Sequence, residues 1–456
     1  MSTDVKQADR PPVYGTGAPD PNAFAGRNGV PLYARRGKLS DYRTYEIYQR
    51  ERVHESTEKI RPIQLSSPDF ARDPYPLLTI LCENYPCYRD WLGNSFWITR
   101  YDDVSSLFAD DANFETRPKT WYYQIEGYGR DLREELPVLE AQARRIDANA
   151  ARLAGEIAED MRAKGGADLA LEFAARFPME LLACVLDLPR EDFPAFVERY
   201  WRMQRGRLWE PRMRQSGLQA IHELTDYFRP ILERRRADPG DDLISAVAAL
   251  DADGGPTRAE DLVVTLLEQD HETLHGGLAN MWFLLLTHPD QFDVVRDDRR
   301  MVKFAWLEML RHSTPVVTAD RFARHEVERF GRLLPNGGLL HLSAAAANRD
   351  PRQYENPDRF IVGRKDLCQR EPRGQYRADG LPAGIAFGLG KPSRHPAVPE
   401  DRPRSLYAIA RDTATTASNV LLDTLPDLRL RPGTSPSLRA LRLGEMHACW
   451  TLPVVF

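Results

Sequence analysis

Two histidines four residues apart are the first feature of the sequence that suggests chemistry. The segment His271-Glu272-Thr273-Leu274-His275 fits the pattern His-Glu-x-x-His, which on a helix sets two imidazoles on one face for zinc and offers the glutamate as general base. The apolar spacing around it predicts a helix, so this local condition is met. Two ordinary helix histidines explain the same pattern, and we predict no metal site.

Acidic and aromatic clusters lie earlier in the chain. Asp110 and Asp111, with Glu115 nearby, are the kind of group that binds magnesium, because hard cations prefer carboxylate oxygens. Solvated acids at the end of a helix are the simpler interpretation. The aromatic run 121–123, with sequence WYY, fits either a pocket entrance or the core. We expect the core, because aromatic side chains usually bury their area.

The cysteines give no metal or disulfide pattern. Their number is odd, and no two of them have the spacing of a Cys-x-x-Cys pair or of a zinc site. We therefore expect isolated thiols that behave as small hydrophobic side chains. They are Cys82, Cys87, Cys184, Cys368 and Cys449.

Charge and hydropathy exclude two classes of partner. The formal net charge is -5 with 28% charged residues, so no single-sign field favours nucleic acid. No stretch of about 18 uncharged apolar residues occurs, and the polar amino terminus lacks the apolar core of a signal peptide. We expect a soluble, cytoplasmic protein with no nucleic-acid or membrane partner.

Residues 1–67 differ in composition from the rest of the chain. Up to about residue 31 they are dense in Pro, Gly and Asn without periodic apolar positions, and residues 39–65 are highly charged. Such composition favours a partly disordered extension. We therefore predict two parts, a polar N-terminal extension at 1–67 and one large domain at 68–456.

The domain has the pattern of a mainly helical protein. Apolar residues recur at steps of three and four along most of it, and the longest such stretch, 258–287, predicts a central helix that crosses a large core. Short runs at 96–100 and 338–342 suit strands. The other predicted helices cover residues 102–108, 132–161, 169–186, 241–250 and 292–311, the last being one helix or a pair of helices.

Several short motifs follow one another along this domain. They are His-Glu-Thr (271–273), His-Pro-Asp-Gln (288–291), Glu-x-x-Arg (308–311), Asn-Arg-Asp-Pro (348–351), Pro-Asp-Arg-Phe (357–360), Phe-Gly-x-Gly (387–390) and Ala-Ile-Ala-Arg (408–411). In this order they resemble the motifs of the bacterial cytochrome P-450 superfamily, from about residue 68 to the carboxyl terminus. The resemblance implies a mainly α, cytochrome P-450-like fold: a large helical domain with a small β-rich portion and a long central helix.

The resemblance assigns a structural role to three charged residues. Glu308 and Arg311 are three residues apart, so a helix places them on one face. Arg359 is implied to complete a buried triad with them. In the family this triad is structural, so we expect it to stabilise the fold.

The resemblance breaks at the loop that ligates haem iron in the family. The loop begins here with Phe387, Gly388 and Gly390, and the family places a cysteine seven residues after the phenylalanine, whose thiolate is the axial ligand. That position holds Arg394, and counting back from the following helix gives Arg404 instead. A guanidinium is always protonated and cannot coordinate iron.

Further changes point the same way. Residues 369–448 contain no cysteine, so shifting the alignment does not restore the ligand. No histidine lies between His54 and His222 to replace the one that pairs with a haem propionate in the family. Gln269 and Asp270 replace the family's small alanine-glycine pair, and a lone buried carboxylate is costly.

We therefore expect no cofactor, and keep haem as the one alternative. If haem is bound, His395 is the nearby side chain able to ligate metal through a neutral imidazole. Arg321 aligns with a position that often helps to hold a propionate in the family. Both residues also have ordinary interpretations, as an exposed loop histidine and as a charge that stabilises the fold.

Three functions remain open. The first is an auxiliary or scaffolding partner of a biosynthetic enzyme, either a glycosyltransferase or an intact cytochrome P-450, because cysteine-less relatives of the superfamily act in this way. The second is a haem-independent cyclase, lyase or isomerase that binds a small apolar molecule and uses Asp270, Glu272 or Thr273 as acid-base groups. The third is an atypical haem oxidoreductase. Whether the chain is an enzyme stays open, but we do not expect a conventional monooxygenase.

Overall fold

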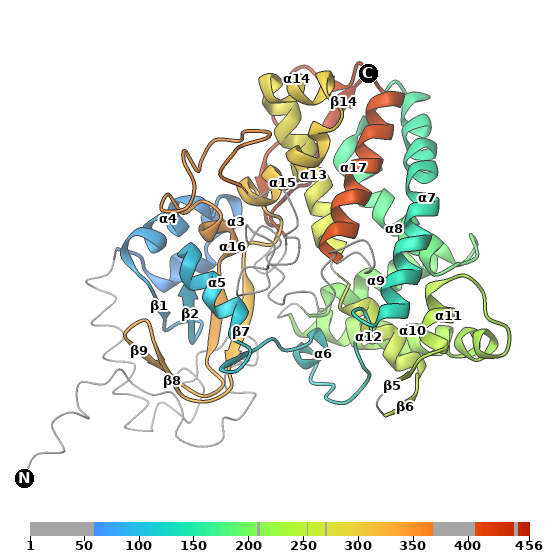
Figure 1. Cartoon of the computed structure of the whole chain (residues 1–456), viewed down its shortest axis with the longest axis horizontal. Coiled ribbons are helices and arrows are strands. Elements are labelled where there is room, and N and C mark those ends of the chain that lie inside the picture. Colours follow the sequence, from blue (N-terminus) through green and yellow to red (C-terminus); the bar gives the residue numbers. More distant parts are fainter. Residues whose placement is uncertain (1–58, 208–209, 253, 270, 368–405, 442–445) are drawn as a thin grey trace, which may run out of the picture.

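The computed structural model describes residues 59–207, 210–252, 254–269, 271–367, 406–441 and 446–456. Figure 1 shows a large helical part on one side and a smaller β-rich part on the other, with α13 near the middle of the helical part. This arrangement is the mainly α fold with a small β-rich portion that the sequence predicts.

Among the described residues of the first half of the chain, no helix before residue 130 has more than 10 residues, and the two longest helices, of 27 residues each, come after it. The described helices of this half are η3 (Pro62–Ser66), α3 (Pro68–Arg72), α4 (Tyr75–Asn84), α5 (Tyr101–Ala109), α6 (Lys119–Tyr122), α7 (Leu136–Arg162), η4 (Ala170–Ala175), α8 (Arg176–Val185), α9 (Phe193–Arg205) and α10 (Pro211–Ala237). The second half contains α11 (Leu243–Ala248), α12 (Ala259–Leu267), α13 (His271–Thr287), α14 (Pro289–Asp297), α15 (Met301–His312), α16 (Ala344–Ala347) and α17 (Leu406–Thr424).

Five strands form the main sheet, in the order β1-β2-β10-β7-β3. Its strands are β1 (Tyr88–Asp90), β2 (Ser95–Ile98), β3 (Phe114–Glu115), β7 (Ala319–Ala323) and β10 (Leu339–Leu342). Strands β2 and β10 are parallel and the other pairs antiparallel. The smaller sheets use β4 (Gly166–Asp168), β5 (Asp251–Ala252), β6 (Gly255–Pro256), β8 (Val327–Arg329), β9 (Arg332–Leu334), β11 (Arg429–Leu430), β12 (Leu438–Arg439), β13 (Ala448–Cys449) and β14 (Pro453–Val455).

The helical core is built around α13. This helix packs against α15, η4 and α17, and α17 in turn packs along α7. Trp282 of α13 and Trp306 of α15 are fully buried. Gly277 makes the close contact possible, because a Cβ atom there would lie 2.5 Å from the Trp306 ring.

The central helix is interrupted, although the sequence predicts one helix over 258–287. Helix α12 ends at Leu267 and α13 begins at His271. Lys119 of α6 explains part of the interruption: its Nζ donates to the Gln269 carbonyl oxygen at 3.2 Å, which an unbroken helix would bond to the amide four residues on. The prediction of an uninterrupted central helix is therefore wrong at residues 268 and 269.

A second apolar cluster covers the β-rich part. It includes Ile60 and Leu65, which are buried against residues of α4, β2 and α16. The packed body therefore begins before the predicted boundary at residue 68. Within the described part of the chain, no helix is long and apolar enough to cross a bilayer.

Candidate functional site

Three buried polar atoms lie at or just before the start of α13 without a hydrogen-bond partner among the described residues. They are the Gln269 Nε2, the Thr273 Oγ1 and the His275 Nδ1. Thr273 is only 2% exposed. An unpaired buried polar group is costly, so this end of α13 suits a bound group that supplies the missing hydrogen bonds.

The two histidines of the zinc-like motif contact α9. The Tyr200 hydroxyl lies 2.8 Å from His271 Nδ1, and Trp201 packs edge-on against both His271 and His275. Burial lowers the pKa of His275 to about 4 and that of His271 well below its ordinary value, so both rings are neutral. No group of three or more ligating side chains suited to a metal occurs among the residues that the structure describes.

An acid that the sequence did not single out lies at the helix interruption. Glu268 is 8% exposed, and its carboxylate accepts the backbone N–H of Lys119 at 2.5 Å. Burial raises the pKa of the Glu268 carboxyl, and the nearby Lys119 opposes that shift. The two residues are 149 positions apart, so no local pattern reveals the contact.

Arg321 is buried and bound within the protein. Its guanidinium donates to the Phe108 carbonyl oxygen at 2.9 Å and to Asp111 Oδ1 at 3.1 Å. Glu115 likewise pairs with Arg117 at 3.1 Å. Arginines thus bind Asp111 and Glu115, which the sequence analysis expected to be solvated acids at the end of a helix.

The structural triad contains a different second arginine from the one predicted. Arg311 forms a two-pronged ion pair with Glu308, both N···O distances being 2.7 Å. Arg364 is the other guanidinium near this carboxylate, at 3.4 Å. Arg359 is exposed and contributes its carbonyl oxygen, which accepts from Arg311 at 3.0 Å. The assignment of Arg359 to the triad is therefore wrong, because the chain turns its side chain outward and brings Arg364 in five residues later.

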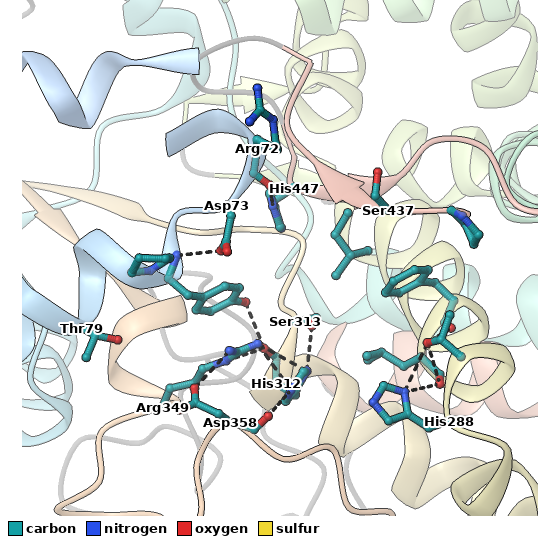
Figure 2. Close-up of a pocket in the computed structure, with 17 residues that line it drawn as sticks. Arg72, Asp73, Thr79, His288, His312, Ser313, Arg349, Asp358, Ser437 and His447 are labelled. Atoms are coloured by element: carbon teal, nitrogen blue, oxygen red, sulfur yellow. Dashed lines mark hydrogen bonds and ion pairs between the residues drawn. The ribbon is translucent and has the colours of Figure 1, made fainter. Parts of the chain in front are cut away.

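A cleft of about 730 Å³ lies between α4, the end of α13 and β12. Figure 2 shows Arg349, His312 and Asp358 meeting on one side of it and His288 on another. Arg349 stacks over the Tyr75 ring at 3.4 Å and donates to the His312 carbonyl oxygen at 2.9 Å. The arginine of the Asn-Arg-Asp-Pro motif therefore holds this wall together.

This cleft is separate from the start of α13. It is lined by Leu284 and Thr287, and Leu284 lies about 16 Å along the helix axis from Thr273 at 1.5 Å per residue. The cleft is thus a different site from the cavity that the motif at 271–273 predicts.

One member of the aromatic run is hydrogen-bonded to a partly buried ion pair. Trp121 packs against Phe322, as expected for a core residue. The Tyr122 hydroxyl instead donates to Asp320 Oδ2 at 3.1 Å, and the other oxygen of Asp320 lies 2.7 Å from His341 Nδ1. Neither Asp320 nor His341 was a candidate from the sequence, because they are 21 positions apart and meet only through the pairing of β7 with β10.

Several predicted site residues lie outside the described part of the chain. They are Asp270, Phe387, Gly388, Gly390, Arg394, His395 and Arg404, and of Glu272 only the backbone is described. Their assignments stay predictions.

The interrupted central helix, the Glu308–Arg311 pair and the mixed five-stranded sheet together define the cytochrome P-450 fold. The chain is a homologue of the bacterial cytochromes P-450. No protein-family model matches it.

The similar proteins come from bacterial secondary metabolism, among other sources. The chain is 29% identical to 6-deoxyerythronolide B hydroxylase of Saccharopolyspora erythraea, over 72% of this chain and 86% of the relative. It is also 29% identical to the cytochrome P-450 monooxygenase PikC of Streptomyces venezuelae, over 82% and 91%. A solved structure of an unusual cytochrome P-450-like monooxygenase of microbial secondary metabolism matches with 25% identity and a TM-score of 0.66, over 82% and 96%.

These relatives correct the prediction that the chain takes no cofactor. They are cytochromes P-450, which are haem proteins, so haem is the cofactor to expect. The unpaired Thr273 hydroxyl and Gln269 amide fit a bound group at the start of α13. Bound haem would supply iron-centred redox chemistry, and Thr273 would contact the group or its ligand.

Proposed function

We propose that this chain is a cytochrome P-450 homologue that serves as an auxiliary partner of an enzyme in natural-product biosynthesis, and that it does not carry out thiolate-driven oxygenation. The observation that carries the proposal is the absence of cysteine from residues 369–448. The proposal does not depend on whether haem is bound.

The missing thiolate matters because it pushes electron density toward the oxygen-oxygen bond in this family. Arg394 and Arg404, the two residues that alignment brings to the ligand position, are cations that only donate hydrogen bonds. A haem held without a thiolate lacks that push. Ordinary monooxygenation is therefore the function that this sequence supports least.

The described residues around α15 keep the buried contacts of the fold. Glu308, Arg311 and Arg364 form a buried network. The Asn-Arg-Asp-Pro segment is joined to α15 through Asn348, whose Nδ2 donates to the Leu310 carbonyl oxygen at 3.4 Å. A protein that keeps the fold but lacks a cysteine to ligate haem iron suits a role in binding another protein. The partners we propose are a glycosyltransferase or an intact cytochrome P-450.

The test measures the activity of the enzyme encoded beside this gene, with and without the purified full-length chain. We expect the turnover of that enzyme, or its half-life at about 37 °C, to increase. The increase should saturate as the concentration of this chain is raised. A reduced carbon monoxide spectrum of the thiolate type, together with substrate oxidation by this chain and redox partners alone, would overturn the proposal.

A second candidate function is an atypical haem oxidoreductase, and the unpaired Thr273 hydroxyl favours it. His395 would then be the axial ligand, a proposal from the sequence alone. Haem-loaded protein should show a Soret spectrum of the imidazole type that His395→Ala changes and His325→Ala leaves as it is. An unchanged spectrum in His395→Ala would exclude this ligand.

A further inference from the structure

We propose that the cleft between α4, the end of α13 and β12 binds a neutral, polyhydroxylated molecule such as a sugar. Its volume of about 730 Å³ lies within the range of roughly 300–1,000 Å³ that small-molecule sites occupy. This inference goes beyond the proposed function and does not require the auxiliary role, because the cleft is separate from the start of α13.

The hydrogen-bond donors of one wall are already used inside the protein. Arg349 donates from Nε to the His312 carbonyl oxygen at 2.9 Å and from Nη1 to Asp358 Oδ1 at 3.2 Å. Its Nη2 also donates to the His312 carbonyl oxygen, at 2.5 Å. The Tyr75 hydroxyl donates to the same oxygen at 2.9 Å. This wall carries a guanidinium but therefore has few donors left for a ligand.

Further donors of the lining are used in the same way. Burial and nearby guanidinium groups lower the pKa of His312 well below its ordinary value, so its ring is neutral. Its Nε2 then donates to the Asp358 carbonyl oxygen at 3.1 Å, and its Nδ1 accepts from the Ser313 hydroxyl at 2.8 Å. The Thr287 hydroxyl donates to the Phe283 carbonyl oxygen at 2.7 Å. A ligand that needs donors from this part of the lining would find few.

His447, which lines the cleft (Figure 2), presents an acceptor instead. Burial lowers the pKa of His447, so its ring is neutral. Its Nε2 lies 3.1 Å from the Arg72 carbonyl oxygen and donates to it, which leaves Nδ1 as an acceptor. That Nδ1 is buried and has no hydrogen-bond partner among the described residues. An unpaired buried acceptor is costly, so a ligand hydroxyl that donates to it would stabilise the complex.

Two other side chains of the lining also have acceptor capacity. His288 Nδ1 lies 2.8 Å from the Leu284 carbonyl oxygen and carries the proton, which leaves Nε2 as the acceptor of the neutral ring. Asp73 is exposed, and its Oδ1 accepts the Tyr75 backbone N–H at 3.1 Å, so the carboxylate can accept further hydrogen bonds. Figure 2 shows Asp73 and His288 on different sides of the cleft. Using these acceptors together takes a ligand with several donors that point in different directions.

The charges around the cleft balance each other. The lining carries two cations and two anions, which are Arg72, Arg349, Asp73 and Asp358. Arg311, whose charge reaches His312, is bound to a buried carboxylate. An ionic ligand of either sign would therefore give up hydration without meeting a net opposite charge. This balance favours a neutral ligand.

The rest of the lining suits both the carbon skeleton and the hydroxyls of a sugar. Phe283 and Leu438 are half-buried and offer apolar surface on which C–H groups can pack. Thr79 and Ser437 are exposed, and each hydroxyl can both donate and accept. An apolar ligand would leave these groups and the histidine acceptors unpaired, whereas a polyhydroxylated ligand pairs with them.

The test is saturation-transfer NMR on the purified full-length chain, with methyl glucoside as the neutral probe near neutral pH. Glucuronate and glucosamine are its anionic and cationic counterparts of similar size. We expect methyl glucoside to bind and both charged sugars to bind more weakly, because each must lose hydration of its charge. No binding of methyl glucoside by the wild type, or tighter binding of either charged sugar, would overturn the proposal.

A variant that fills the cleft locates the binding site. Ser437→Leu adds volume at an exposed position of the lining without removing a described hydrogen bond, so the fold should be kept. It should weaken methyl glucoside binding about tenfold or more. Ser66→Leu makes the same change at an exposed position outside the lining and should bind as the wild type does. Equal affinity of Ser437→Leu and the wild type would place the sugar elsewhere and refute the inference.

Two histidine variants test the acceptors. His447→Phe should weaken binding about fivefold, because one hydrogen bond to the ligand is lost. His288→Phe should act in the same direction, and His288→Gln, which keeps an acceptor, should recover part of the affinity. Because His288 is only half-buried, its variants serve if His447→Phe does not fold. Unchanged affinity in His288→Phe and in a folded His447→Phe would contradict recognition through these acceptors.

Discussion

His275 shows how burial decides the chemistry of a residue that the sequence presents as a metal ligand. Its ring is 8% exposed and lies between Trp201 and Trp450, with ring centroids 6.1 and 6.0 Å away. Among the groups that the structure describes, burial is the cause that lowers the pKa of His275. The motif residue is thus a neutral core side chain.

This burial predicts a loss of stability in acid. The pKa of His275 is about 4 in the folded state and 6.5 when exposed, so the unfolded chain takes up the proton first. The stability that the neutral His275 ring contributes is fully present above pH 6.5 and is lost as the pH falls toward 4. It amounts to about 3 kcal/mol in the free energy of unfolding. Urea unfolding of the wild type and of His275→Phe at about pH 7 and about pH 4.5, on either side of the ordinary histidine pKa, measures this contribution.

The variant should lose less stability than the wild type between these two pH values. His325→Phe, at an exposed position, should behave as the wild type does. Identical pH dependence of the wild type and His275→Phe would show that His275 is not buried as a neutral ring.

At the scale of single elements, α13 depends on a residue with no side chain. Gly277 lies against the fully buried Trp306 of α15, and Trp306 has little room to move. Helix propensity alone would favour alanine at this position. The contact between the two helices therefore overrides the local preference.

We expect Gly277→Ala to destabilise the protein by about 1–3 kcal/mol, because the new methyl group forces α13 and α15 apart. Gly155 of α7 provides the matched control. A Cβ atom there would meet its nearest neighbour, Val420, at an ordinary 3.7 Å. Gly155→Ala should stabilise the protein by roughly 0.5–1 kcal/mol. Thermal unfolding of both variants gives the comparison, and a neutral Gly277→Ala would contradict the packing.

At the scale of the whole molecule, Glu308 joins segments that are far apart in the sequence. Its carboxylate binds Arg311 on the same helix, Arg364 further along, and the backbone N–H of Ile361 at 3.0 Å. All of this is buried, where removing one partner of an ion pair is costly. The network fixes the segment after β10 against α15.

Arg364 and Arg359 distinguish the observed network from the one that the motif implied. Arg364→Met should lower the free energy of unfolding by roughly 3 kcal/mol, because Glu308 loses a buried partner. Arg359→Met should change it by less than about 0.5 kcal/mol, since its side chain is exposed. Denaturant midpoints measure both, and the reverse order would restore Arg359 to the triad.

The sequence by itself determined the fold and several elements. The apolar periodicity and the ordered motifs are local, so they identified β2, α5 and α7 within a few residues, and the Glu308–Arg311 pair. The predicted stretch 292–311, one helix or a pair, is the pair α14 and α15. The lack of cysteine at 369–448 is likewise a property of the sequence. The inference that no cofactor binds went further than this property allows, and the relatives corrected it.

Only the tertiary structure decided which distant groups meet. Lys119 with Glu268, Tyr122 with Asp320, and Arg321 with Phe108 are each joined across more than a hundred residues. Hydrogen bonds and ion pairs act over a few ångströms, and sequence spacing carries no information about such distances once the chain has turned several times. The same reason explains why Arg364, and not Arg359, lies beside the Glu308 carboxylate. A turn of the chain, not a motif, sets which of the two side chains points inward.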